Sequence, residues 1–179
     1  MKNERPHKPL SSDPRIYPFG GIPNWEEGIE RESSAKMHYE HLQTKLEELG
    51  VAIPADAKIL EIGSGNNVFL RYLQKLGLDA VGVDAKPRGE RTENIVRARI
   101  EQLPFPDETF GLIISNAVFD SDVYHQEQLA MVKEIARVLK HGGIYFGTLN
   151  YDEKTPFGEF LEVLSKSKGP IGSSVYRKK

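Results

Sequence analysis

The sequence predicts an α/β protein built on a doubly wound, mostly parallel β-sheet with helices on both faces. Short apolar segments rich in β-branched residues alternate along the chain with longer segments whose apolar residues recur at helical spacing. The first short segment leads into a glycine-containing turn at Gly63 and Gly65, which is where such sheets bind ligands. Alternation of this kind indicates parallel strands joined by helices.

The chain divides into an N-terminal arm, residues 1–32, and one domain, residues 33–179. The full length of 179 residues lies within the usual size of a single domain. Five of the eleven prolines stand in the first 23 residues, so this part of the arm is expected to be extended rather than helical. Asn24 and Glu27 resemble a capping box that opens a short helix at the end of the arm.

The composition excludes several kinds of site and partner. The sequence has no cysteine, which excludes disulfides, thiolate metal sites and cysteine nucleophiles, and we expect no metal. The net charge of −2 gives no basic excess, so no nucleic-acid partner is expected. There is no run of about 18 apolar residues and no apolar signal core at the N-terminus, so we expect no membrane partner and a cytoplasmic location.

Apolar spacing places the elements of the first half of the domain. A helix is expected over 33–49, before Gly50, and a buried strand over 58–62. Another helix is expected to end at Gly77 and to bury one face, made of Phe69, Tyr72, Leu73 and Leu76. Strands are expected over 79–83 and 94–97.

The second half continues the alternation and then becomes shorter. A strand over 112–115 is followed by a helix over 126–139 and a strand over 144–149. The inward face of that helix is expected to hold Leu129, Val132, Ala136 and Leu139. A helix over 157–166 and one strand over 173–177 finish the chain, so we expect the sheet to be abbreviated at its C-terminal edge.

The turn after the first strand has the features of a nucleotide site. Gly63 and Gly65 let the backbone turn sharply and approach a ligand. Asp84 ends the second strand 21 residues after Gly63, a spacing that suits a carboxylate accepting hydrogen bonds from two ribose hydroxyls. A dinucleotide site would have a third glycine at position 68, where this chain has Val68, so a dinucleotide is disfavoured.

Four motifs in order resemble those of class I S-adenosylmethionine-dependent methyltransferases, which have a Rossmann-like fold. Residues 59–65, ILEIGSG, resemble their first motif, and Asp84 matches their acidic second motif. Residues 102–110, QLPFPDETF, and 135–143, IARVLKHGG, are similar to the ubiquinone-biosynthesis-like branch, whose acceptors are small molecules. The resemblance covers about residues 57–150.

The resemblance implies S-adenosylmethionine as cofactor, S-adenosylhomocysteine as product and a role for each matching residue. Gly63 and Gly65 would line the methionine part, and Asp84 would hold the ribose. Glu61 either touches the ligand or braces the turn. The full set of cofactor-binding residues is expected to be Glu61, Gly63, Ser64, Gly65, Asp84, Ala85, Ile100, Glu101, Asn116 and Ala117.

Three positions depart from the family pattern. Asn67 stands at the third glycine of the first motif, and asparagine tolerates a positive φ better than most residues. Arg99 stands where an aspartate commonly accepts from the adenine amino group, and arginine has only donors. Gly111 replaces an aspartate before the fourth strand.

The acceptor side is the least specified. Methyl transfer from a sulfonium depends largely on alignment and needs a base only when the acceptor loses a proton. Asp120, Tyr124 and His125 follow the fourth strand and are the catalytic candidates. We expect a small or medium-sized organic acceptor. The alternative is a non-catalytic protein that binds S-adenosylmethionine, or has lost it, and acts through a partner. A third possibility, methylation of a protein or nucleic acid, is disfavoured because the sequence indicates no basic face and no added recognition domain. Monomer and homodimer both stay open.

Overall fold

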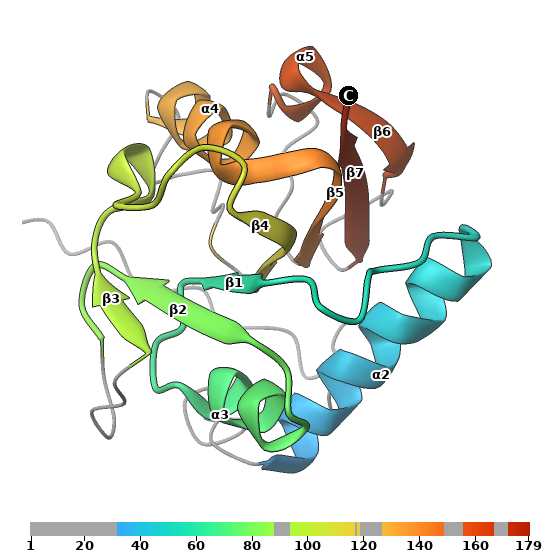
Figure 1. The fold of residues 1–179 in the computed structure, drawn as a ribbon, viewed down its shortest axis with the longest axis vertical. Helices are drawn as coiled ribbons and strands as arrows, with labels where there is room; N and C mark the ends of the chain where they lie inside the picture. The colour runs from blue at the N-terminus through green and yellow to red at the C-terminus, as the bar shows by residue number, and fades with distance from the viewer. Residues whose placement is uncertain (1–31, 88–93, 117, 119–126, 149–155, 167–171) are drawn as a thin grey trace, which may run out of the picture.

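The computed structural model contains one seven-stranded sheet in the order β3-β2-β1-β4-β5-β7-β6 (Figure 1). It describes residues 32–87, 94–116, 118, 127–148, 156–166 and 172–179. The strands are β1 (Ile59–Ile62), β2 (Ala80–Asp84), β3 (Ile95–Arg97), β4 (Phe110–Asn116), β5 (Leu139–Thr148), β6 (Leu161–Ser165) and β7 (Ser173–Lys178). β1 to β5 run parallel and β7 is antiparallel to both of its neighbours, so the expected α/β class is confirmed.

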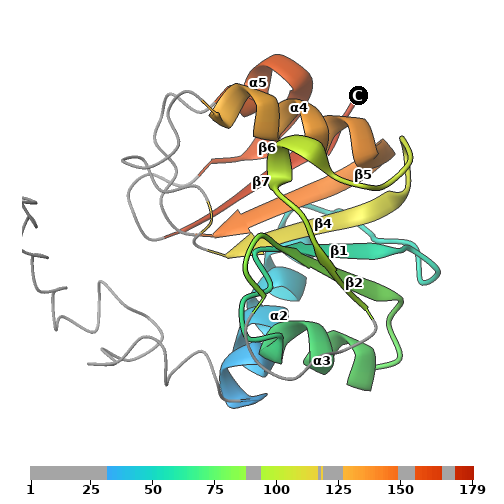
Figure 2. The same cartoon turned by 90° about the vertical axis from the view of Figure 1, so that its left-hand side faces the viewer.

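The helices cover both faces of this sheet. α2 (Glu32–Glu48) and α3 (Val68–Lys75) lie on one face, and α4 (Gln128–Val138) and α5 (Phe157–Phe160) lie on the other (Figure 2). A 3₁₀ turn, η1 (Ile100–Gln102), leads from β3 toward β4 and contacts α4. None of the described helices is long and apolar enough to cross a membrane. The arm, with its expected capping box at Asn24, lies outside the described residues.

Two hydrophobic cores follow from the alternation of side chains along the strands. On the α2 and α3 side, Ile59 packs with Leu42 and Phe69. On the α4 and α5 side, Leu60 packs with Val132 and Tyr145. The sheet is therefore buried on both faces, as parallel sheets generally are.

The inward face of two helices differs from the expected one. In α4 the buried residues are Gln128, Met131, Val132, Ile135 and Val138. The expected Leu129 is 43% exposed and Ala136 is only partly buried, because the helix presents a neighbouring stripe to the sheet. In α3 the expected Leu76 is 46% exposed, since the helix has ended at Lys75, and Leu70 is buried instead.

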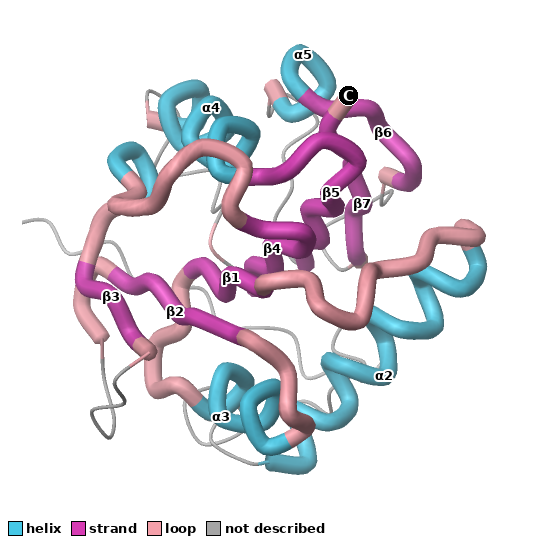
Figure 3. The backbone as a smooth tube through the Cα atoms, in the orientation of Figure 1, coloured by secondary structure: helices cyan, strands magenta, loops and turns pink. Residues whose placement is uncertain are grey.

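The C-terminal edge is complete rather than abbreviated. The expected helix over 157–166 is correct only for its first turn, since α5 ends at Phe160 and passes directly into β6 (Figure 3). β6 pairs antiparallel with β7, and this pairing gives the backbone of β6 its ladder hydrogen bonds. The residues of β6 also suit a helix, so their local preference does not predict the strand. The expectation of one strand at this edge was therefore wrong, and two are present.

An arginine in the last turn of α4 ties the segment before β4 to the domain. The Arg137 guanidinium donates to the carbonyls of Leu103 and Phe105 at 3.0 and 2.8 Å, and to Asp107 at 2.8 Å. Glu134 receives two further bonds from Arg137 and accepts from the Leu103 N–H at 2.9 Å. These contacts hold η1 and the following proline-containing segment against α4.

Candidate functional site

The loop between β1 and α3 adopts the backbone that its residue types suggest. Gly63, Gly65 and Asn67 all have positive φ, of 74°, 51° and 69°. A side chain at Gly63 would place its Cβ 2.5 Å from Val118 Cγ2, so this position also needs glycine for space. At Gly65 the nearest atom to an added Cβ is 3.8 Å away, so the chain is open on that side. The expectation that Asn67 accommodates the turn is confirmed.

Asp84 joins the ends of β1 and β2. Its Oδ2 accepts a hydrogen bond from the Gly65 N–H at 2.9 Å, and its Oδ1 accepts from the Lys86 N–H at 2.6 Å. A carboxylate has about four lone-pair positions, so each oxygen can still accept one more hydrogen bond. The side chain is half-buried and can receive two ligand hydroxyls beside the open face of Gly65.

Glu61 lies buried at the end of β1, with 5% of its surface exposed. The pKa of its carboxyl is raised to about 8, chiefly by burial. A hydrogen bond from the Leu70 N–H opposes this increase, and the nearby charge of Asp84 adds to it. Leu70 lies in the first turn of α3, where backbone N–H groups have no acceptor within the helix. Glu61 thus caps α3, which is the bracing interpretation of this residue. Its Oε2 has no hydrogen-bond partner among the described residues.

Ser64 is the second buried polar side chain of the loop, with 4% of its surface exposed. Its Oγ has no hydrogen-bond partner within the described part of the chain. The same Oγ packs so close to Gly82 of β2 that a Cβ added to Gly82 would lie 2.9 Å from it. Ser64 therefore packs beneath β2.

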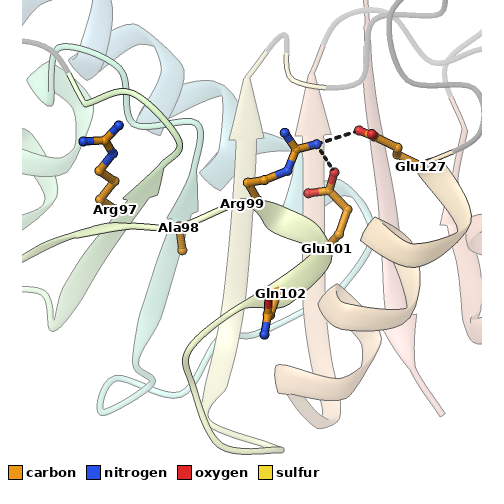
Figure 4. Close-up of a pocket in the computed structure, with 6 residues that line it drawn as sticks. All are labelled: Arg97, Ala98, Arg99, Glu101, Gln102 and Glu127. Atoms are coloured by element: carbon orange, nitrogen blue, oxygen red, sulfur yellow. Dashed lines mark hydrogen bonds and ion pairs between the residues drawn. The ribbon is translucent and has the colours of Figure 1, made fainter.

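The expected nucleobase side borders an open pocket of about 780 Å³ (Figure 4). Its walls are Arg97, Ala98, Arg99, Glu101, Gln102 and Glu127. Ala85 follows β2 on the adjacent strand end, and its carbonyl accepts from Arg97 Nε at 3.3 Å. Ile100 and Glu101 form η1 at the edge of this pocket.

Arg99 points away from β3 toward two carboxylates, as Figure 4 shows. It donates to Glu101 at 2.7 Å and to Glu127 at 2.9 Å. Burial by itself raises the pKa of Glu101. The hydrogen bond and charge of Arg99, together with hydrogen bonds to the Glu101 backbone and to Glu127, outweigh burial and bring the pKa below its ordinary value. The positive charge at this unusual position is therefore matched by two negative charges.

Gly111 also has a local physical reason. A Cβ at this position would lie 2.8 Å from Ala57 Cβ, and the Gly111 N–H donates to the Lys58 carbonyl at 3.0 Å. The chain before β1 therefore occupies the space that a side chain at position 111 would need.

Asn116 ends β4 at the same edge of the sheet. Ser115 pairs with Ile62, so Asn116 stands level with Gly63. The Thr148 hydroxyl donates to Asn116 Oδ1, and Asn116 Nδ2 lies 3.5 Å from His38 Nδ1. The neighbouring Ala117 and the catalytic candidates Asp120, Tyr124 and His125 lie outside the described residues.

Two histidines of α2 reach this edge, and the sequence reading did not find them. His38 is half-buried and lies edge-on to Phe69, with ring centroids 6.1 Å apart. Burial, and then the proximity of His41, lower its pKa to about 4. His41 lies 3.1 Å from Ser173 Oγ. A signal was present, because His38 falls between Ala35 and Leu42 on the apolar stripe of the helix.

Within the ranges that the structure describes, no three histidine, aspartate or glutamate side chains gather into a group that could hold a metal ion.

The chain is similar to a methyltransferase family model and to several known proteins. A family model described as a methyltransferase domain matches residues 60–147, from β1 to β5. The uncharacterized methyltransferase YcgJ of Bacillus subtilis is 30% identical over 144 residues, covering 69% of this chain and 55% of that protein. EEF1A lysine methyltransferase 2 of Homo sapiens is 31% identical over 130 residues, covering 62% and 55%. The chain spans about half the length of these relatives.

Among solved structures, the PH0226 protein of Pyrococcus horikoshii matches with a TM-score of 0.56 at 20% identity. The match covers 84% of this chain and 93% of that one. At this identity the likeness shows the shared fold.

Proposed function

We propose that this chain, which belongs to the class I S-adenosylmethionine-dependent methyltransferases, binds S-adenosylmethionine and transfers a methyl group to a small or medium-sized organic acceptor. The observation that carries the proposal is the position of Asp84. Its carboxylate is fixed by the Gly65 and Lys86 N–H groups, and each oxygen keeps the capacity to accept a ribose hydroxyl.

The residues at the strand ends can be assigned to the parts of this cofactor in order. In this proposal Gly63, Ser64 and Gly65 line the methionine part, where the backbone is open beside Gly65. Asp84 holds the ribose, and Ala85 lies against the adenine.

In this proposal the backbone of η1 binds the edge of the adenine ring. Ile100 and Glu101 border the 780 Å³ pocket, and in this proposal their backbone receives the adenine. Arg99 replaces the usual acidic residue, and its ion pairs with Glu101 and Glu127 balance its charge at the wall of this pocket.

Methyl transfer requires the chain to align donor and acceptor rather than to supply a strong reagent. S-adenosylmethionine supplies a methyl group on a positively charged sulfur. Asn116, which ends β4, faces the reacting centre in this proposal, and Ala117, expected there from the sequence, lies outside the described residues. Holding the two reactants in line at contact distance lowers the activation free energy by about 7–11 kcal/mol in well-oriented systems.

Two rival functions share the same fold. A protein lysine acceptor is supported by the name of the human relative, which describes a lysine methyltransferase. A non-catalytic, cofactor-binding role would explain the departures at Asn67, Arg99 and Gly111. Against that role, Asn67 adopts the required left-handed backbone and Gly111 has a packing reason.

Calorimetric titration with S-adenosylmethionine and S-adenosylhomocysteine tests the cofactor site. We expect both to bind ligand-free protein, and Asp84→Ala to weaken binding at least about tenfold, because hydrogen bonds to a charged group contribute about 1.5–3 kcal/mol each. Asp79→Ala, an exposed aspartate at the other end of β2, is the matched control and should bind like wild type. Absence of binding by wild type would contradict the proposal.

Transfer of labelled methyl separates the rival functions. The protein is incubated with labelled S-adenosylmethionine and, separately, with the small-molecule and the protein fractions of a cell extract. Label in the small-molecule fraction supports the proposed acceptor class, and label in the protein fraction supports the lysine alternative. Binding without transfer to either fraction supports the non-catalytic role.

A further inference from the structure

A donor and an acceptor of hydrogen bonds lie side by side at the end of β4. Asn116 Nδ2 is 3.5 Å from His38 Nδ1, which is a long hydrogen bond. The orientation of the amide is set by Thr148, the neighbour of Asn116 in the sheet, whose hydroxyl donates to Oδ1. Asn116 therefore presents its NH₂ group toward His38.

This contact also sets the state of the imidazole. Because Nδ1 faces an NH₂ group, it acts as the acceptor, and the proton of the neutral ring stands on Nε2. Burial and then His41 lower the pKa of His38 to about 4, so the ring is neutral near pH 7. Among the residues that the structure describes, His41 is the titratable group that acts on it, whereas Phe69 and Asn116, which contact it, do not titrate.

The hydrogen-bond donor of Asn116 and the acceptor of His38 together match the hydrogen-bonding pattern of a hydroxyl group. A hydroxyl has one O–H donor and two lone pairs. When a hydroxyl enters beside the pair, its O–H replaces the long Asn116 contact as the donor to His38 Nδ1, and Asn116 Nδ2 donates to one lone pair of the hydroxyl oxygen. The second lone pair of that oxygen is left to attack. An alkylammonium has only donors and cannot accept from Asn116.

The pair also lies beside the loop that would hold the cofactor. Asn116 stands level with Gly63 across the β1–β4 pairing. His38 contacts Phe69, the second residue of α3, immediately after that loop. Both side chains are half-buried, so they are accessible and partly shielded from water.

We propose, on the basis of the methyltransferase function above, that His38 and Asn116 bind a hydroxyl group of the methyl acceptor and that His38 takes its proton. The acceptor oxygen forms a bond to the methyl carbon of S-adenosylmethionine. The carbon–sulfur bond breaks, and its electron pair stays on sulfur. The O–H proton passes to His38 Nδ1, and the resulting imidazolium releases a proton to water.

The basicity of His38 suits oxygen better than nitrogen. An oxygen that is gaining a methyl group becomes a far stronger acid than an imidazolium, so even a weakly basic histidine can receive its proton. A lysine-type ammonium, with a pKa near 10, does not give a proton to such a base. The acceptor class that follows is an alcohol or a phenol.

The test uses three variants of the full chain. His38→Asn keeps a hydrogen-bond acceptor close to the position of Nδ1 but cannot take a proton. His38→Ala removes both functions. His141→Asn, the same substitution at an exposed histidine near the opposite end of β5 from Thr148, is the matched control. Each variant is assayed for S-adenosylhomocysteine binding by calorimetry. Each is also assayed for transfer of labelled methyl to the small-molecule fraction. Mild alkali first releases the label of methyl esters as methanol, and hot hydriodic acid then releases the label of methyl ethers as methyl iodide.

We expect wild type and His141→Asn to form an O-methyl product at similar rates. His38→Asn should lose at least about 100-fold in rate, the usual contribution of a general base, with S-adenosylhomocysteine affinity unchanged. His38→Ala should be no faster. Label on nitrogen, on carbon or in a methyl ester, an undiminished His38→Asn rate, or weakened S-adenosylhomocysteine binding in His38→Asn would each overturn this inference alone. Absence of any transfer by wild type would overturn the proposed function, and this inference with it.

Discussion

The Asp84 carboxylate accepts a hydrogen bond from the Gly65 N–H at 2.9 Å, and this single contact connects the ends of two neighbouring parallel strands. It requires the chain to turn sharply after β1, since the backbone N–H of residue 65 must face β2. The positive φ values of Gly63 and Gly65 provide that turn. The proposed ribose contact therefore depends on the loop as well as on the carboxylate.

The two glycines of this loop should differ in their tolerance of a side chain. In Gly63→Ala the new Cβ would lie 2.5 Å from Val118 Cγ2 and at a positive φ. In Gly65→Ala only the backbone strain applies, at about 1–2 kcal/mol. We expect Gly63→Ala to lower the free energy of unfolding by a further 1–3 kcal/mol, roughly the usual cost of overpacking. Urea unfolding of both variants measures the difference, and equal losses would contradict this account.

Gly111 should resist restoration of a side chain because of Ala57. Gly111→Ala would place its Cβ 2.8 Å from Ala57 Cβ, and we expect it to destabilise the protein by about 1–3 kcal/mol. In an Ala57→Gly background the same substitution should cost less, since the opposing methyl group is absent. A double-mutant cycle by urea unfolding gives the coupling energy, which we expect to exceed about 0.5 kcal/mol. Purely additive effects would show that the close contact is not the cause.

Arg137 should not be replaceable by lysine. Its planar guanidinium donates to the carbonyls of Leu103 and Phe105 and to two carboxylates at once, which a single ammonium cannot do. We expect Arg137→Lys to lower the free energy of unfolding by about 1–3 kcal/mol. Arg177→Lys is the matched control, because Arg177 makes one exposed ion pair at 3.7 Å and should change stability by less than about 1 kcal/mol. Similar losses in both variants would contradict the role given to the η1 segment.

The parts of the fold that the sequence predicted are those with local signals. β1, β2 and β4 are short apolar segments, and the loop after β1 combines glycines with an asparagine that adopts the same backbone. The missed strand β6 is different, because its residues also suit a helix and only pairing with β7 decides between the two. The face of α4 was misassigned because the polar Gln128 is buried while Leu129 is exposed.

The residues of the candidate site also divide into those that a local sequence signal predicts and those that depend on the tertiary structure. Asp84 could be found by its distance along the chain from Gly63, since βα units have regular lengths. His38 could not be found by spacing, because its partner Asn116 lies 78 residues away and the contact depends on how α2 crosses the sheet. A polar residue within the apolar stripe of α2 was the one local indication.

Glu61 should make the stability of the protein depend on pH, and Glu61→Gln tests this. Burial raises the folded-state pKa of Glu61 from 4.5 to about 8, so between these values the folded protein holds a proton that the unfolded chain has lost. The contribution to stability is full below about pH 4.5, falls by up to about 1.4 kcal/mol per pH unit as pH rises, and is lost once pH passes about 8.

The glutamine side chain of that variant keeps an acceptor for the Leu70 N–H but cannot ionise. We therefore expect wild type to lose stability relative to Glu61→Gln as pH rises from about 5 to about 8, by several kcal/mol in all. Urea unfolding of both proteins at a series of pH values measures the difference, in which the titration of other groups cancels. A constant difference across this range would mean that Glu61 is already ionised in the folded protein, and that its carboxylate, rather than a neutral carboxyl group, caps α3.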